Sequence, residues 1–172
     1  MSHLDEFRAG KDEFFRDSPD APLTASQRRH FTGLAYYEEN PALALEVEAV
    51  PFEQRELVSM QTSTGGEATY ERWARVTFRV DDAEASLTLY REPGSGHIFL
   101  PFQDSNAGGE TYGAGRYLEV LPLEANRVLL DFNYAYNPYC AYNDGWSCPV
   151  PPAENRLQVP IRAGERTFTG AH

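Results

Sequence analysis

The chain has 172 residues, of which 41% are hydrophobic, and its net charge is −11. This length and composition predict one globular domain over residues 1–172, and no apolar run is long enough to predict a membrane span. Because the negative charge is spread along the sequence, most of the surface would repel a polyanion, which disfavours nucleic acid as a partner.

The first 36 residues predict a helical segment packed on the rest of the chain. Ser2 with Asp5, and Thr24 with Gln27, have the spacing of a capping box, so we expect two short helices. The opening stretch is acidic, whereas a signal peptide begins with basic residues and continues with apolar ones. We therefore expect a cytoplasmic protein.

From residue 37 to residue 172 the sequence predicts a β domain, because the hydrophobic period changes to that of strands. Alternation is clearest at 74–80, where Ala74, Val76, Phe78 and Val80 would face the core. About eight strands without intervening helices predict a mainly β fold, an antiparallel meander that closes as a small barrel or packs as a sandwich. The predicted strands are 43–50, 56–62, 70–80, 85–92, 97–102, 116–122, 126–133 and 157–161.

The segment 137–155, NPYCAYNDGWSCPVPPAEN, contains four prolines and both cysteines of the chain. Because proline has no N–H to donate, the segment cannot be a central strand, and we expect an ordered flap across the sheet. Seven residues separate Cys140 from Cys148, so neither a zinc-ribbon nor a thioredoxin-type CxxC is present. Packed thiols, a disulfide and a redox site all remain open for this pair, and no metal site is predicted.

Two C-terminal blocks carry a resemblance to a known family. The blocks are LPFQDSNAGGETYGAGRYLEV at 100–120 and LDFNYAYNPYCAYNDGWSCPVPPAENRLQVPIRAGER at 130–166, and SQRRHFTGLAYY at 26–37 fits the opening of the same family. In residue type, order and spacing the chain resembles DUF1684, an uncharacterised bacterial and archaeal family of unknown function. The resemblance implies a shared fold and a shared site, but it supplies no activity.

The polar residues of these blocks predict a small-ligand site. Six of the ten tyrosines fall between residues 112 and 142. Tyr, Asn and Arg on one surface would form a pocket with apolar walls and a few directed hydrogen bonds. We therefore predict that a small polar, aromatic or anionic ligand binds beneath the flap, with Arg116 holding an anionic group. The predicted site residues are Tyr112, Arg116, Asn133, Tyr136, Asn137, Tyr142 and Asn155.

The same residues leave two other functions open. In a purely structural or partner-binding domain, Arg116 would pair internally with Asp131 or Glu154. In a hydrolase or isomerase, Glu110, Asp131 or Glu154 would serve as acid and base, or would hold a metal together with His97. The sequence has no GxSxG, HExxH, P-loop or dinucleotide motif, so it predicts no cofactor and no specific reaction, and it leaves the oligomeric state open.

Overall fold

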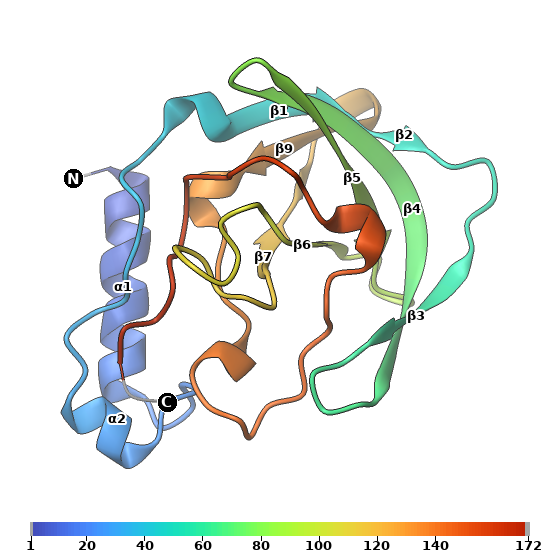
Figure 1. Cartoon of the computed structure of the whole chain (residues 1–172). Helices are drawn as coiled ribbons and strands as arrows, with labels where there is room; N and C mark the ends of the chain where they lie inside the picture. Colours follow the sequence, from blue (N-terminus) through green and yellow to red (C-terminus); the bar gives the residue numbers. More distant parts are fainter. Residues whose placement is uncertain (1, 171–172) are drawn as a thin grey trace.

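The computed structural model describes residues 2–170, which form two antiparallel sheets with two helices along one side (Figure 1). The helices are α1 (His3–Asp17) and α2 (Ala25–Arg29), and the side chains of Ser2 and Thr24 cap them through the predicted capping boxes. The prediction of two N-terminal helices is confirmed. In the described part of the chain, neither helix is long and apolar enough to cross a membrane.

Nine strands of the described residues form the two sheets. The larger sheet has the order β2-β4-β5-β6-β7, with β3 also paired to β4, and the smaller sheet has the order β1-β9-β8. The prediction of a mainly β, antiparallel fold is confirmed, whereas closure into a barrel is wrong because the strands form two separate sheets. The strands are β1 (Ala44–Glu48), β2 (Val50–Pro51), β3 (Leu57–Gln61), β4 (Glu67–Val80), β5 (Ala83–Arg91), β6 (Ile98–Phe102), β7 (Arg116–Glu119), β8 (Leu121–Pro122) and β9 (Arg127–Asp131).

Two predicted strands pass from one sheet to the other. The stretch 43–50 forms β1 and β2 on either side of Ala49, and the stretch 116–122 forms β7 and β8 on either side of Val120. At the first corner the N–H of Ala49 donates to the carbonyl of Asn126, outside the strand pairs, at 2.8 Å. A strand that bends to change sheets forms a corner between them. These corners hold the two sheets around one core without closing a barrel.

The predicted strand at 157–161 is wrong. This segment runs beside the loop at 103–105 and pairs with it only at isolated points. Pro160 has no N–H for a ladder, and the next donor, the N–H of Ile161, is bonded to the carboxylate of Asp104 at 2.8 Å. A buried side chain therefore replaces a neighbouring strand as the partner of this backbone.

The main core lies between the two sheets. The alternation predicted at 74–80 is confirmed, since every second side chain of that stretch is buried and those between are exposed. Val128 and Leu130 of β9 bury their side chains in the same core, and the ring of Phe132 lies 5.6 Å from that of Phe78 on β4. The outer face of each sheet is therefore left for the helices and for the proline-rich segment.

Candidate functional site

The proline-rich segment, residues 137–155, crosses the outer face of the larger sheet as irregular chain with short 3-10 turns at Tyr139–Ala141 and Ala153–Asn155 (Figure 1). The side chains between the segment and the sheet form a second buried cluster. Its members are Met60, Tyr90, Phe99, Tyr117, Cys140 and Cys148. The hydroxyl of Tyr117 also donates to the carbonyl of Pro149. Packed side chains thus attach the segment to the sheet.

Arg116, which was predicted to hold an anionic ligand, lies inside the protein with only 1% of its surface exposed. Its Nη1 donates to the carbonyls of Ala163, at 2.5 Å, and Glu165, at 3.0 Å, while Nη2 donates to the carbonyl of Ile161 at 2.9 Å. Burial lowers the pKa of Arg116, and the carboxylate of Asp104, 3.7 Å from Nη2, opposes that shift. The guanidinium is therefore occupied by the chain's own carbonyls and by an internal carboxylate.

Tyr142 and Asn137 contact a second buried carboxylate, that of Glu165. The hydroxyl of Tyr142 and the backbone N–H of Asn137 donate to Oε1 of Glu165, and Lys11 of α1 forms an ion pair with Oε2. Burial and the nearby Glu165 raise the pKa of Tyr142 far above its ordinary value. This contact joins α1 to the C-terminal end of the chain. Sequence reasoning gave Glu165 no role, although the residue belongs to the second family block.

Asn155 and Asn133 hydrogen-bond to backbone in the interior. Oδ1 of Asn155 accepts from the N–H of Thr88, and its Nδ2 donates to the carbonyls of Thr88 and Pro101, each at 2.8 Å. Oδ1 of Asn133 accepts from the N–H of Asn40 at 2.8 Å, and its Nδ2 donates to the carbonyl of Asn40 at 3.0 Å. Each amide therefore satisfies backbone groups that the sheets leave unpaired.

Tyr112 lies beside the two cysteines, which are buried and are not joined by a disulfide. The hydroxyl of Tyr112 is 3.7 Å from Sγ of Cys140, and the N–H of Cys140 donates to Sγ of Cys148 at 3.3 Å. The hydrogen bond between the two thiols lowers the pKa of Cys140, despite its burial, and raises the pKa of Cys148. The two sulfurs are in contact but chemically unequal.

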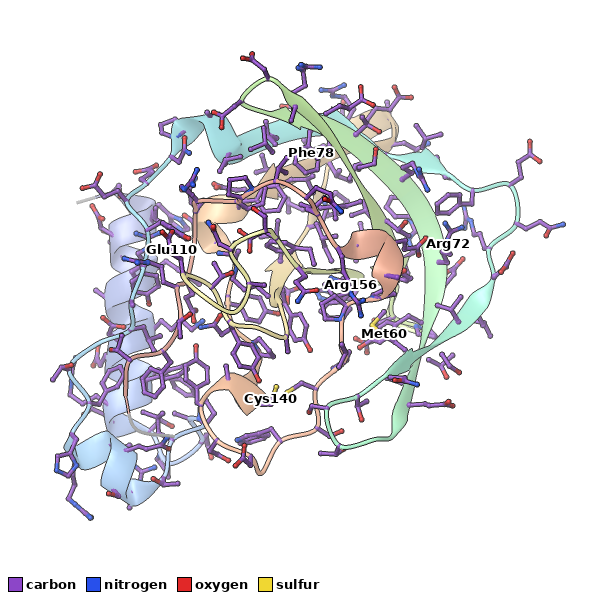
Figure 2. The ribbon with its side chains drawn as sticks, in the orientation of Figure 1. Met60, Arg72, Phe78, Glu110, Cys140 and Arg156 are labelled. Carbon is purple, nitrogen blue, oxygen red and sulfur yellow. The ribbon has the colours of Figure 1, made fainter. Side chains whose placement is uncertain are left out.

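Glu110 and Glu154 have separate partners. Glu110 is exposed and accepts from the hydroxyl of Tyr37 at 2.8 Å. Glu154 is held by Arg72, whose Nη2 donates at 2.8 Å, and by the hydroxyl of Tyr90. Burial alone would raise the pKa of Glu154, but these two hydrogen bonds lower it below its ordinary value. Figure 2 shows Glu110 and Arg72 on opposite sides of the molecule. Within residues 2–170, no three His, Cys, Asp or Glu side chains are placed to hold a metal ion.

Asp131 and Tyr136, two further predicted site residues, line a cleft of about 420 Å³ between the start of α1 and the smaller sheet; we call this the N-terminal cleft. Asp131 and Leu129 are two residues apart on β9, so both point away from the core that buries Val128 and Leu130. Leu129 pairs in turn with Leu121 of β8. The remaining lining residues are His3, Phe7, Glu119 and Tyr134.

The cleft has an apolar wall. Phe7 is 41% exposed and Leu121 is 55% exposed, and both face the cleft. The ring of Tyr134 packs edge-on against Phe7, with the ring centroids 5.0 Å apart. Sequence reasoning missed this wall, although His3 and Phe7, four residues apart on a helix, are expected to share a face.

The polar groups of the cleft include two carboxylates and their donors, together with the ring of His3, whose Nδ1 is 2.6 Å from the hydroxyl of Tyr134. Glu119 accepts from the hydroxyl of Tyr136 at 2.5 Å, and its other oxygen pairs with His97. Burial, followed by the hydrogen bond to Glu119, raises the pKa of Tyr136, which keeps the phenol a neutral donor. Oδ1 of Asp131 accepts from the N–H and the amide of Asn133, at 3.1 and 2.9 Å. Two negative groups thus face an apolar wall across one opening.

A family model described as "Protein of unknown function (DUF1684)" matches residues 29–166. The chain belongs to this family. The match confirms the resemblance seen in the sequence, and it spans both sheets and the proline-rich segment, whereas the α1 wall of the N-terminal cleft lies before it.

One solved structure agrees with this assignment. The chain is similar to the solution NMR structure of an uncharacterised protein of Haloarcula marismortui, with 36% sequence identity and a TM-score of 0.73. The similarity covers 95% of this chain and 92% of the archaeal chain, so it extends past the start of the family match into α1. No curated protein matches the chain.

Proposed function

We propose that this DUF1684 protein binds a small amphipathic cation, an amine on an apolar or aromatic body, in the N-terminal cleft. The observation that carries the proposal is that exposed apolar side chains and two carboxylates share one opening of about 420 Å³. Small-ligand sites typically measure roughly 300–1,000 Å³ and combine mostly apolar walls with a few polar groups. The proposal keeps a small ligand and the predicted binding residue Tyr136. It replaces the predicted anionic group by a cation, gives Asp131, predicted as a catalytic candidate, a binding role, and moves the site from beneath the proline-rich segment to the cleft.

The apolar wall supports an apolar or aromatic body for the ligand. Phe7 and Leu121 are large hydrophobic side chains left exposed beside each other in a concave site. Removing apolar surface from water stabilises a complex by about 25 cal/mol per Å². A ligand that covers about 100 Å² of this wall would therefore gain roughly 2.5 kcal/mol before the cost of its own ordering.

The carboxylates support a positive charge on the ligand. Glu119 is held in place by the hydroxyl of Tyr136. Asp131 uses Oδ1 to accept from Asn133, and no described residue hydrogen-bonds to its Oδ2. An ammonium group donates charge-assisted hydrogen bonds to carboxylates and is attracted to aromatic faces such as that of Tyr134. The net charge of −11 adds a long-range attraction for cations.

The test is an NMR titration of ¹⁵N-labelled protein with 2-phenylethylamine, using phenylacetate as a probe with the same ring and the opposite charge. We expect the amine to shift the backbone signals of Leu129 and Tyr136, with phenylacetate much weaker. Asp131→Asn and Glu119→Gln should each weaken amine binding by about tenfold, the cost of one charge-assisted hydrogen bond. Glu84→Gln, at an exposed carboxylate of β5 outside the cleft, serves as the matched control.

Two results would contradict the proposal. Equal shifts from both probes would show that the cleft binds any aromatic ring and that its carboxylates do not favour a cation over an anion. Shifts at Leu121 that follow protein concentration, and not amine concentration, would show that a second copy of the chain covers the apolar wall. The acid–base alternative gains no support from these contacts, because Glu110, Asp131 and Glu154 have separate partners.

A further inference from the structure

The two cysteines are brought together although seven residues separate them in the chain. Cys140 lies in the 3-10 turn Tyr139–Ala141, and after the loop at 143–147 the chain returns so that Sγ of Cys148 accepts from the N–H of Cys140 at 3.3 Å. The two side chains also hydrogen-bond to each other. The fold therefore brings the two thiols into contact with each other.

The loop between the cysteines is already attached to the neighbouring turn. Ser63 Oγ donates to the carbonyl of Trp146 at 3.2 Å and accepts from the N–H of Cys148 at 3.1 Å. The hydroxyls of Thr64 and Ser147 are 2.7 Å apart. The backbone at 146–148 is thus held by the neighbouring turn before the sulfurs react, so a bond between them would not require that part of the segment to refold.

The surroundings of the two sulfurs divide their roles. Cys140 receives hydrogen bonds from the Cys148 thiol and from the hydroxyl of Tyr112, and both favour its thiolate. The contact between the thiols raises the pKa of Cys148, and the backbone N–H of Cys140, which donates to Sγ of Cys148 at 3.3 Å, partly opposes that shift. The thiolate is the nucleophilic form of cysteine, so the Tyr112 hydroxyl beside Sγ of Cys140 favours Cys140 as the attacking sulfur and Cys148 as the second to react.

We infer that Cys140 and Cys148 form an oxidisable dithiol that reduces a hydroperoxide and closes to an intramolecular disulfide. With hydrogen peroxide, the Cys140 sulfur forms an S–O bond as the O–O bond breaks, and the departing hydroxide takes up a proton to become water. The sulfur of Cys148 then attacks Cys140, and the S–S bond forms as the sulfenic oxygen leaves as water with the Cys148 proton. The dithiol loses two electrons and two protons, and the peroxide yields two waters.

Because the thiols of Cys140 and Cys148 are buried, only a small oxidant can reach them. Both cysteines are buried, and the rings of Tyr139 and Trp146 pack edge-on over the same turn with centroids 5.0 Å apart. A peroxide is small enough to pass side chains that rotate, whereas the disulfide of another protein would have to displace the loop at 143–147. The resulting bond would link the two ends of that loop and hold it against the sheet.

The experiment follows the intact mass of the reduced protein after treatment with equimolar hydrogen peroxide. We expect the wild type to lose two hydrogens, and Cys148→Ser to stop at a sulfenic acid on Cys140 that dimedone traps. We expect Cys140→Ser to react at least tenfold more slowly. Tyr112→Phe, which removes the hydroxyl and keeps the ring, should slow the first step several-fold.

A second measurement needs no variant and so does not depend on whether a substitution folds. The native wild type is treated with substoichiometric iodoacetamide, and peptide mapping then shows which thiol is alkylated. Preferential alkylation of Cys140 supports the division of roles. Equal alkylation of both thiols, preference for Cys148, or oxidation of the wild type to sulfinic acid without a disulfide would overturn the inference.

Discussion

The buried network around Arg116 and the N-terminal cleft draw on the same family blocks, yet they use their charges in opposite ways. In the network, Arg116 is 1% exposed, and its guanidinium donates to three backbone carbonyls and pairs with the carboxylate of Asp104. In the cleft, the side chain of Glu119 is 52% exposed. The difference teaches that a cluster of Tyr, Asn, Arg and carboxylate in a sequence does not identify a site until the partners of its polar atoms are known.

The physical reason lies in the cost of burying charge. A buried guanidinium or carboxylate loses its hydration, so the fold must supply several partners, and these partners leave no atoms for a ligand. A carboxylate at the mouth of a cleft keeps part of its hydration, so it needs fewer partners and can exchange water for a ligand. The structural and ligand-binding residues should therefore separate in experiments that measure stability and affinity together.

The largest expected effect is on Arg116. Arg116→Met keeps much of the side-chain length but removes the donors to three carbonyls and leaves the buried carboxylate of Asp104 without its ion pair. We expect a loss of about 3–5 kcal/mol in the free energy of unfolding, measured by urea denaturation. Arg75→Met, at an exposed position of β4, should stay within about 0.5 kcal/mol of the wild type. A loss below about 1 kcal/mol for Arg116→Met would show that the network contributes little to stability.

A smaller effect is expected at Lys11, the only lysine of the chain. Lys11→Met leaves the buried carboxylate of Glu165 with the donors Tyr142 and Asn137 alone, so we expect a loss of about 2–3 kcal/mol. Pairing it with Glu165→Gln removes the uncompensated charge and should restore part of that loss, which a double-mutant cycle in urea would measure.

The matched control for this prediction is Arg16→Met, because Arg16 is an exposed cation in the last turn of the same helix. It should change the free energy of unfolding by less than about 0.5 kcal/mol. If the losses in the free energy of unfolding from Lys11→Met and Glu165→Gln simply add in the double variant, with no recovery, the two side chains are not coupled. The contact between them would then not attach α1.

The sequence was enough to predict the local elements of the fold. The capping boxes at Ser2 and Thr24 and the alternation at 74–80 depend on neighbours in the chain, and the structure confirms them. The points at which the chain passes from one sheet to the other, Ala49 and Val120, could not be predicted, because the residues on both sides of each point have the pattern of an ordinary strand. The prediction of a strand at 157–161 was wrong for a related reason: it depended on a partner distant in the sequence. The N–H of Ile161 donates to the side chain of Asp104 and not to a neighbouring strand.

The candidate site could be predicted only in part. The faces of β9 follow from its period of two, which puts the side chains of Asp131 and Leu130 on opposite faces of the strand. The apolar wall required knowing that the start of α1 lines the same cleft as β8 and β9, and Phe7 and Leu121 carry no motif that would show it. For Arg116 the sequence predicts the strand on which the residue lies, but it does not predict the hydrogen-bond partners. The carbonyls to which its guanidinium donates belong to the segment 161–165, which is distant in the sequence.

The smallest effect on stability, and the sharpest contrast with Arg116, is expected at Glu119. Glu119→Gln keeps an oxygen to accept from Tyr136 and loses only a surface ion pair with His97, so the free energy of unfolding should change by less than about 0.5 kcal/mol. In the same preparation the affinity for 2-phenylethylamine should fall by about tenfold. A urea midpoint that drops as it does for Lys11→Met would make Glu119 part of the structural network. An unchanged midpoint with unchanged affinity would mean that the exposed carboxylate of the cleft serves neither role, and the contrast between the two regions would then rest on Asp131 alone.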